Sequence, residues 1–223
     1  MTDTRPHQRN PGDVAPEEGL SPTLTFFRQW LKNPLTTAAL SPSSRQLARL
    51  MMQELPPGAQ RVIELGGSTG VFTRALLDHG IAPDKLMVLE LNQELHQYLS
   101  QRFVNARVVC GDARELDRLV REYHFADGAV VDAIISGLGL LSMSRRMQRE
   151  ILEAAFAVMA PQGRLIQFTY GPVSPVPREL LDDLGLKVRR GGFAWWNMPP
   201  ASVFVFERSR STPVHPVRAA FRR

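Results

Sequence analysis

Cysteine is nearly absent from this sequence: Cys110 is the only one in 223 residues. No disulfide can therefore form within the chain, which fits a reducing compartment. Long apolar runs are also missing, since no stretch approaches the ~18 apolar residues that span a bilayer. The polar, Pro- and Gly-rich N-terminus has no apolar core like that of a signal peptide, so we expect a cytoplasmic protein. The five histidines are scattered, and we expect no metal site.

Acidic residues are missing from two segments, although the chain as a whole has an ordinary 22% of charged residues. Residues 19–53 contain no Asp or Glu, and neither does the tail after Glu207. Both segments carry Lys or Arg, and the net charge of the chain is +5. Basic segments without acids suit anionic surfaces such as nucleic acid or acidic lipid headgroups. For the tail, a simple solvated basic end remains an equal alternative.

The N-terminal quarter differs in pattern from the rest of the chain. Residues 1–20 have the composition of a disordered segment. Ser21 and Pro22 are typical of a helix start, and the apolar stripe that follows predicts an amphipathic helix ending at Asn33-Pro34. A second helix is predicted from Ser41-Pro42 onward. The expected organisation is therefore a disordered N-terminus at 1–20, amphipathic helices at 21–56, one globular domain at 57–208 and a basic tail at 209–223.

From residue 60 onward, apolar segments typical of strands alternate with helical ones. Strands are predicted at 61–65, 85–91, 106–113, 130–137, 164–171, 186–192 and 202–208, with helices near 70–79, 93–102, 113–122, 144–159 and 177–184. This alternation predicts an α/β protein whose parallel sheet is covered on both faces. The last two strands have no helix between them and predict an antiparallel hairpin. Seven strands ending in this way resemble the Rossmann-like class I methyltransferase fold, whose mostly parallel sheet has an antiparallel last strand.

The first strand runs into a glycine-bearing turn, "ELGGSTG", of the kind that opens many nucleotide pockets. Gly66 and Gly70 do not have the G-x-G-x-x-G spacing of dinucleotide sites, and the turn has no P-loop lysine. Acidic residues end the first three strands. Glu64 stands beside the turn, Glu90 follows Gly70 by 20 residues, the spacing of a ribose-binding carboxylate, and Asp112 ends the third strand. Ligands bind at this edge of open sheets, so the set predicts a cofactor site, although each acid alone fits a solvated rim residue as well.

Seven segments point together to one family. "FFRQWLKNP", "SPSSRQLARLM", "VIELGGSTGVFTRALL", "VVCGDA", "SGLGLLS", "FTYGPVSP" and "NMPPASVFVFER" occur in this order. Together they resemble the bacterial phospholipid N-methyltransferases of the rhizobial type, which convert phosphatidylethanolamine to phosphatidylcholine. The resemblance covers roughly residues 24–208. Two departures stand out, since Ser68 replaces a glycine of the family's turn and Gly139 replaces a proline after the fourth strand.

The resemblance implies S-adenosyl-L-methionine as the cofactor and a phospholipid amine as the acceptor. The cofactor-binding residues that it implies are Glu64, Gly66, Ser68, Gly70, Glu90, Leu91, Asp112, Ala113 and Ser136, with Asp112 facing the adenine amine. Tyr170, at the end of the fifth strand, is the expected catalytic residue, because its hydroxyl can orient an attacking amine. The alternative for Tyr170 is a half-buried aromatic side chain with its hydroxyl in water.

Membrane contact is expected at the N-terminus. Phe26, Phe27 and Trp30 would enter the boundary between headgroups and acyl chains, while Arg28 and Lys32 meet anionic lipid. The alternative is that the same stripe packs on the domain. Arg45 is the candidate partner of a lipid phosphate because its planar fork matches phosphate oxygens, or else a surface arginine. Trp195 and Trp196 would add a second contact or pack as a buried lid. We therefore expect a peripheral protein of the cytoplasmic membrane.

Three rival functions remain. An enzyme for ornithine lipid or another aminolipid would share the same chemistry. An RNA adenine N6-methyltransferase is similar in fold, but the Asn-Pro-Pro-Tyr motif of such enzymes is missing after the fourth strand, where "SGLGLLS" stands. The "NMPPA" at Asn197–Ala201 lies before the last strand, and we interpret it as a loop feature. A binding protein that has lost cofactor affinity through Ser68 is the third rival.

Overall fold

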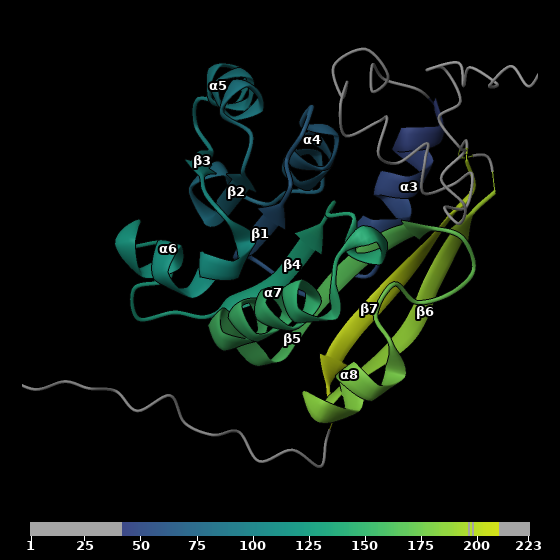
Figure 1. Ribbon diagram of the computed structural model, residues 1–223. Coiled ribbons are helices and arrows are strands. Elements are labelled where there is room, and N and C mark those ends of the chain that lie inside the picture. Colours follow the sequence, from purple (N-terminus) through teal and green to yellow (C-terminus); the bar gives the residue numbers. More distant parts are fainter. Residues whose placement is uncertain (1–41, 196, 198, 210–223) are drawn as a thin grey trace, which may run out of the picture.

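The computed structural model describes residues 42–195, 197 and 199–209 (Figure 1). Residues Phe26, Phe27, Arg28, Trp30, Lys32 and Trp196, for which membrane contact is expected, lie outside this part of the chain. The described part holds the strands β1 (Val62–Leu65), β2 (Leu86–Glu90), β3 (Arg107–Cys110), β4 (Val131–Ser136), β5 (Met159–Tyr170), β6 (Leu186–Ala194) and β7 (Ala201–Arg208). Its α-helices are α3 (Pro42–Gln53), α4 (Val71–Asp78), α5 (Gln93–Arg102), α6 (Leu116–Glu122), α7 (Arg145–Val158) and α8 (Arg178–Asp183), with short 3-10 turns at Pro83–Lys85, Ala113–Glu115 and Leu140–Ser142.

The strands form one sheet in the order β3-β2-β1-β4-β5-β7-β6. Strands β1 to β5 pair in parallel, whereas β7 is antiparallel to both β5 and β6. The predicted class I methyltransferase fold, including the closing hairpin, is therefore confirmed. The carboxyl ends of β1 to β6 share one edge of the sheet, which we call the carboxyl edge.

The sheet is packed on both faces (Figure 1). One core cluster joins it to α6, α7 and α8, and a second joins it to α3, α4 and α5. Central strands are buried along their whole length, as the near-continuous apolar runs of β1 and β2 predict. Two buried faces thus hold the strand ends in a fixed arrangement.

Strand β5 begins at Met159, earlier than the sequence predicted. The predicted strand began only at residue 164, after Pro161, Gln162 and Gly163, but these three residues lie within β5. The pairing of β4 with β5 shifts register here, since Val131 faces Met159 whereas Ala133 faces Arg164. An irregularity in the strand therefore accommodates the turn-forming residues.

Helix α3 packs its apolar side against α4 and β6 and buries Leu47, Met51 and Met52. Glycines in β6 permit this close approach, because a Cβ at Gly192 would lie only 3.2 Å from Leu50 Cδ2. An ion pair of 2.6 Å between Glu54 and Arg189 anchors the end of the helix. The apolar side of α3 thus belongs to the core.

Candidate cofactor and methyl-transfer site

The turn between β1 and α4 has a left-handed backbone at three positions. Gly66 and Gly70 have φ of 77° and 80°, and Ser68 between them has φ of 48°. The amide of Gly66 donates to the carbonyl of Leu89 on β2 at 2.8 Å. Because a side chain disfavours positive φ, the serine at position 68 has a conformational cost that a glycine would not have.

Two glycines let this turn pack directly onto the core. A Cβ at Gly67 would lie 2.5 Å from Val88 Cγ1, and one at Gly70 would lie 2.3 Å from Phe103 Cε2. Both distances are far below van der Waals contact, so neither position has room for a side chain. The turn is therefore held close to the sheet, directly before the N-terminus of α4.

Glu64 is completely buried at the end of β1. Its Oε2 accepts a 2.5 Å hydrogen bond from the hydroxyl of Thr73 on α4. Its Oε1 is buried and has no hydrogen-bond partner among the described residues. Burial raises the pKa of Glu64 to about 8, and the nearby Glu90 adds to the shift. A cationic ligand group beside the unpartnered oxygen would favour the ionised carboxylate and offset the cost of burying it.

Glu90 holds the turn in place with both of its oxygens. Its Oε2 accepts from the amide of Ser68 at 2.9 Å, and its Oε1 accepts from the amide of Asn92 at 2.9 Å. Each carboxylate oxygen can accept a further hydrogen bond. The expected role on ribose hydroxyls is thus compatible with the geometry and stays a prediction.

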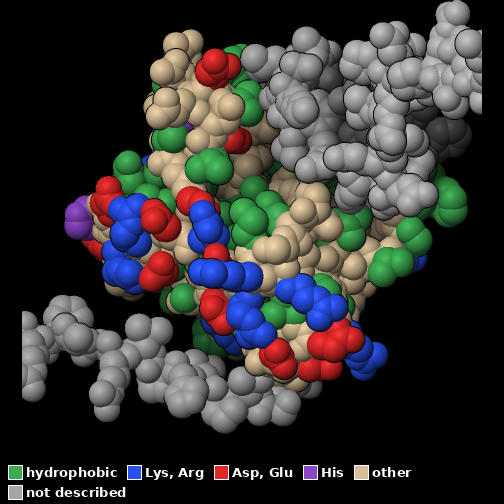
Figure 2. All heavy atoms as spheres, viewed as in Figure 1, with side chains coloured by type: hydrophobic (Ala, Val, Ile, Leu, Met, Phe, Trp, Pro, Cys, Tyr) green, Lys and Arg blue, Asp and Glu red, His purple; other side chains and the backbone are tan. Residues whose placement is uncertain are grey.

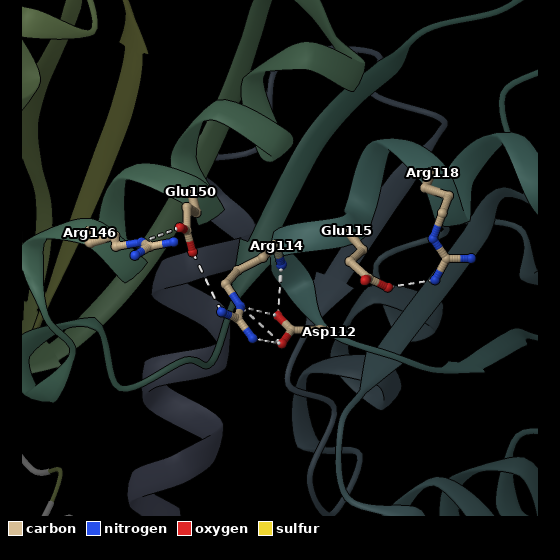
Figure 3. Close-up of polar contacts among 6 residues, drawn as sticks. All are labelled: Asp112, Arg114, Glu115, Arg118, Arg146 and Glu150. Carbon is tan, nitrogen blue, oxygen red and sulfur yellow. Dashed lines mark hydrogen bonds and ion pairs between the residues drawn. The ribbon is translucent and has the colours of Figure 1, made fainter.

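Asp112 is contacted by Arg114, a residue that no sequence motif indicated (Figure 3). Arg114 donates to it through its backbone amide at 2.9 Å and through Nη2 at 2.6 Å. These contacts hold the pKa of Asp112 below its ordinary value. Arg114 also lies 3.5 Å from Glu150, which Arg146 contacts at 2.8 Å. Contact of Asp112 with adenine stays a prediction. It requires Arg114 to release at least one of its hydrogen bonds to the Asp112 carboxylate, so that an oxygen can accept from the ligand.

The other expected cofactor residues also lie at the carboxyl edge. Leu91 follows β2 and is 66% exposed, Ala113 opens the turn after β3, and Ser136 ends β4 with a buried side chain. The hydroxyl of Ser136 accepts from the amide of Leu138 at 3.3 Å. The cofactor-binding roles expected of Leu91, Ala113 and Ser136 stay predictions.

Tyr170 ends β5 at the same edge and is half-buried. Its ring packs edge-on against Phe168 with centroids 5.5 Å apart. Burial raises the pKa of its hydroxyl, and a hydrogen bond with the side chain of Asn197 offsets this only in part. The hydroxyl therefore stays protonated at neutral pH and can accept a hydrogen bond through a lone pair.

Asn197 is a site residue that the sequence interpretation missed. The "NMPPA" segment was interpreted as a loop feature, yet Asn197 is only 5% exposed and contacts Tyr170. Its Nδ2 donates to the carbonyl of Pro199 at 2.8 Å. An asparagine two residues before a pair of prolines was the available signal, because asparagine and proline are typical turn residues.

Two buried glutamines were missed as well. Gln148 on α7 donates to the carbonyls of Leu140 and Pro175, at 2.7 and 3.0 Å. Gln167 on β5 donates to the carbonyl of Leu138 at 2.8 Å. Both side-chain oxygens are buried without a hydrogen-bond partner in the described part of the chain. These glutamines hold the loop after β4. Gln167 lies between Ile166 and Phe168 in a predicted strand, and that position was the available signal for its burial, whereas Gln148 stands in a polar stretch of a helix.

The remaining expectations have mixed outcomes. Arg45 is exposed on the first turns of α3, and its role on phosphate stays a prediction. Trp195 is 74% exposed and stacks edge-on against Phe193, with centroids 4.4 Å apart, so it is not a buried lid. Within residues 42–195, 197 and 199–209, no helix has the length and apolar character needed to cross a bilayer.

The site suits S-adenosylmethionine by its own chemistry. A tight glycine turn before a helix, an orphaned buried acceptor on Glu64 and the acidic ends of β2 and β3 match a ligand with a cationic amino acid end and a nucleoside end. The hydroxyl of Ser68 is a second buried atom with no hydrogen-bond partner among the described residues.

Comparisons with known proteins agree with this interpretation. Residues 62–163 match the family model "Methyltransferase domain". A glycopeptide N-methyltransferase solved with S-adenosylmethionine has a TM-score of 0.58 at 13% identity, covering 76% of this chain and 96% of its own. A TehB-like S-adenosylmethionine-dependent methyltransferase from Corynebacterium glutamicum has a TM-score of 0.54 at 19% identity, covering 83% and 97%. At these identities the likeness shows the fold.

A curated relative is nearer in sequence. The ornithine lipid N-methyltransferase of Singulisphaera acidiphila is 30% identical over 186 residues, which span 80% of this chain and 92% of that protein. With this identity over nearly the whole relative, together with the fold and the glycine turn, the chain belongs to the family of class I S-adenosylmethionine-dependent methyltransferases that includes this relative.

Proposed function

We propose that this enzyme transfers methyl groups from S-adenosylmethionine to the amine of a membrane aminolipid, with ornithine lipid as the first candidate. The observation that carries the proposal is the 30% identity to an ornithine lipid N-methyltransferase over 92% of its length. The sequence had favoured phosphatidylethanolamine and kept ornithine lipid as the alternative. The relative supports that alternative better. Phosphatidylethanolamine, whose headgroup carries the same primary amine, is the second candidate.

The cofactor side of the site carries the acids. Glu64, Ser68 and Glu90 would hold the amino acid and ribose parts of the cofactor, and Asp112 its adenine. When bound, the cofactor supplies an electrophilic methyl group on a cationic sulfur. The acidic residues at the ends of β1, β2 and β3 therefore lie toward the cationic ligand rather than toward the acceptor.

The acceptor side carries no charge in its loops. An amine attacks only in its neutral form, whereas a free alkylamine has a pKa near that of lysine, about 10. A neighbouring carboxylate would keep it protonated. The loops 137–144, 171–177 and 195–200 contain no Asp or Glu, so the surroundings of Tyr170 favour the neutral amine by desolvation.

Tyr170 is the proposed orienting group. Its protonated hydroxyl, steadied by Asn197, presents a lone pair to an N–H of the amine. Such a hydrogen bond directs the nitrogen lone pair away from the hydroxyl and toward the methyl group. Alignment of this kind supplies much of the rate in a displacement between two bound partners.

The test is methyl transfer from labelled S-adenosylmethionine by the full chain. Vesicles containing ornithine lipid, vesicles containing phosphatidylethanolamine and ribosomal RNA are offered separately. We expect label in ornithine lipid first. Label in RNA without label in either lipid would overturn the proposal and favour the RNA alternative. Absence of transfer, with no heat of binding to S-adenosylhomocysteine, would favour a binding protein that has lost its cofactor.

The role of Tyr170 is tested by Tyr170→Phe. We expect kcat to fall by about 10- to 100-fold with little change in cofactor affinity, because only the acceptor loses a partner. Tyr123→Phe is the matched control, since Tyr123 ends α6 with a 40% exposed side chain and should leave kcat unchanged. Equal kcat for both variants would refute the assignment.

A further inference from the structure

Three loops at the carboxyl edge share an unusual composition. Residues 137–144 follow β4, residues 171–177 follow β5 and residues 195–200 join β6 to β7. Together they contain no Asp, Glu, Lys, Arg or His, in a chain of which 22% is charged. We call these three loops the acceptor rim.

Hydrogen bonds tie the rim into one surface. Gln148 bridges the loops after β4 and β5 through the carbonyls of Leu140 and Pro175. Ser202 on β7 donates to the carbonyl of Gly171 at 2.6 Å. The side chain of Asn197, in the third loop, contacts Tyr170 just before the second. The second loop thus follows Tyr170 directly, the third loop contacts it through Asn197, and the first loop is joined to the second.

Each loop of the rim exposes a large apolar side chain. Leu141 is 47% exposed, Val173 72% and Trp195 74%. Figure 2 shows hydrophobic side chains gathered at the right-hand edge, over the region where Figure 1 draws the loop after β5. Over α6, α7 and α8 the same view shows Arg and Lys interleaved with Asp and Glu. The rim thus differs from an ordinary solvated surface.

Arginines stand where the rim meets the regular elements. Arg145 opens α7 after the first loop, Arg178 opens α8 after the second, and Arg190 lies on β6 before the third. All three are exposed, and Arg190 also donates to the carbonyl of Pro172. An apolar, charge-free centre with cations at its border matches a bilayer surface, where apolar side chains enter among the acyl chains and cations meet anionic headgroups.

We propose that the acceptor rim docks on the surface of an anionic lipid bilayer and places Tyr170 at the level of the headgroup amines. This inference rests on the proposed function, because only a membrane-borne acceptor would require it. It is separate from the contact expected of the N-terminal helix. Val173 and Trp195 would insert, and Leu141 would lie at the margin.

Vesicle flotation tests the docking. The full chain is mixed with vesicles of phosphatidylcholine and phosphatidylglycerol, and the bound fraction of Val173→Ser/Trp195→Ser is compared with that of Val104→Ser/Val130→Ser. Val104 and Val130 are matched controls, because they are 75% and 52% exposed and precede β3 and β4 at the opposite edge. We expect the rim variant to lose affinity for vesicles by about 5- to 10-fold and the control to match the parent chain. Equal binding by both variants would overturn the proposal.

Tryptophan quenching locates the contact directly. The chain has three tryptophans, so Trp30→Phe/Trp196→Phe leaves Trp195 as the only emitter. Lipids brominated along the acyl chains should quench its emission once vesicles are added. Vesicle binding without quenching would assign the contact to another surface. A dimer that Val173→Ser/Trp195→Ser converts to monomer, with vesicle binding unchanged, would show that a second copy of the chain covers the rim.

A soluble acceptor separates this inference from the proposed function. With a short-chain ornithine lipid below its micelle concentration, the rim variant should lose much less turnover, relative to the parent chain, than it loses on vesicles. If the parent chain methylates neither the soluble lipid nor the lipid in vesicles, the proposed function fails. If the parent chain and the rim variant have equal turnover on vesicles, the docking proposal fails while the proposed function stands.

Discussion

At the scale of single residues, Ser68 is where this chain departs most clearly from the glycine pattern of its turn. Its φ of 48° lies in the left-handed region, which a side chain disfavours. The backbone amide of Ser68 donates to Glu90, while the Ser68 hydroxyl is buried without a hydrogen-bond partner among the described residues. Strain at a ligand loop combined with an unused polar atom suggests that the hydroxyl serves the ligand.

Ser68→Gly separates the backbone from the hydroxyl. We expect the free energy of unfolding to rise by about 1 kcal/mol, because glycine adopts positive φ without the clash that a Cβ causes. Affinity for S-adenosylhomocysteine should fall by about 3- to 10-fold if the hydroxyl is worth one ordinary hydrogen bond. Urea unfolding and titration calorimetry measure the two effects.

Ser68→Ala is the control for this prediction, because it removes the hydroxyl but keeps the Cβ and its strain. It should lower affinity as Ser68→Gly does, without any gain in stability. Unchanged affinity in both variants would show that the hydroxyl makes no contact with the cofactor.

At the scale of elements, periodicity and turn chemistry were sufficient for most of the sheet. Buried strands such as β1 and β2 were recognisable in the sequence as short apolar runs, and the helices between strands were predicted close to their observed bounds. The positions of Glu64 and Glu90 at the carboxyl edge were predictable, because the ends of parallel strands meet at one edge of a sheet. Their roles on the cofactor stay predictions. The register shift between β4 and β5 could not be predicted, because it depends on how the extra residues of β5 fit beside β4.

Contacts between distant loops could not be predicted from the sequence. Tyr170 and Asn197 meet only because β7 returns beside β5 and brings its preceding loop to the same edge. Arg114 beside Asp112 is a local pair, yet the expectation of a free adenine-binding carboxylate hid it. Side-chain pairing across loops depends on tertiary packing, which periodicity does not report.

Gln148 on α7 joins the loop after β4 to the loop after β5 through two hydrogen bonds. Replacing it by leucine keeps the volume but leaves the carbonyls of Leu140 and Pro175 without their donor. We expect the free energy of unfolding to fall by about 1–3 kcal/mol, and kcat to fall by about 10-fold through misplacement of the acceptor loops. Urea unfolding and steady-state kinetics with a soluble acceptor measure both effects.

The matched control is Gln97→Leu on α5, where the glutamine is exposed and away from the loops. It should change neither quantity by more than the spread of the measurement. A folded Gln148→Leu enzyme with full kcat would show that the loops keep their places without this clamp.

At the scale of the whole molecule, Glu64 links the stability of the domain to pH. Its folded-state pKa of about 8 lies above its ordinary value of 4.5. Between these values the folded chain holds a proton that the unfolded chain has released, so stability must fall as pH rises through this window. Below pH 4.5 the full contribution is present, and it is lost as pH rises through about 8.

Glu64→Gln removes this dependence, because the amide is neutral at every pH. We expect the variant to gain melting temperature relative to the parent chain between pH 5 and 8, with the largest difference at the alkaline end. In a domain of this size each kcal/mol corresponds to about 2–4 °C, so the difference is readily measured by calorimetry. All other titrating groups are common to both chains, so the difference curve reports on Glu64. A difference that stays flat with pH would mean that Glu64 is ionised in the folded enzyme, and its unpartnered oxygen would then need a cation even before the cofactor binds.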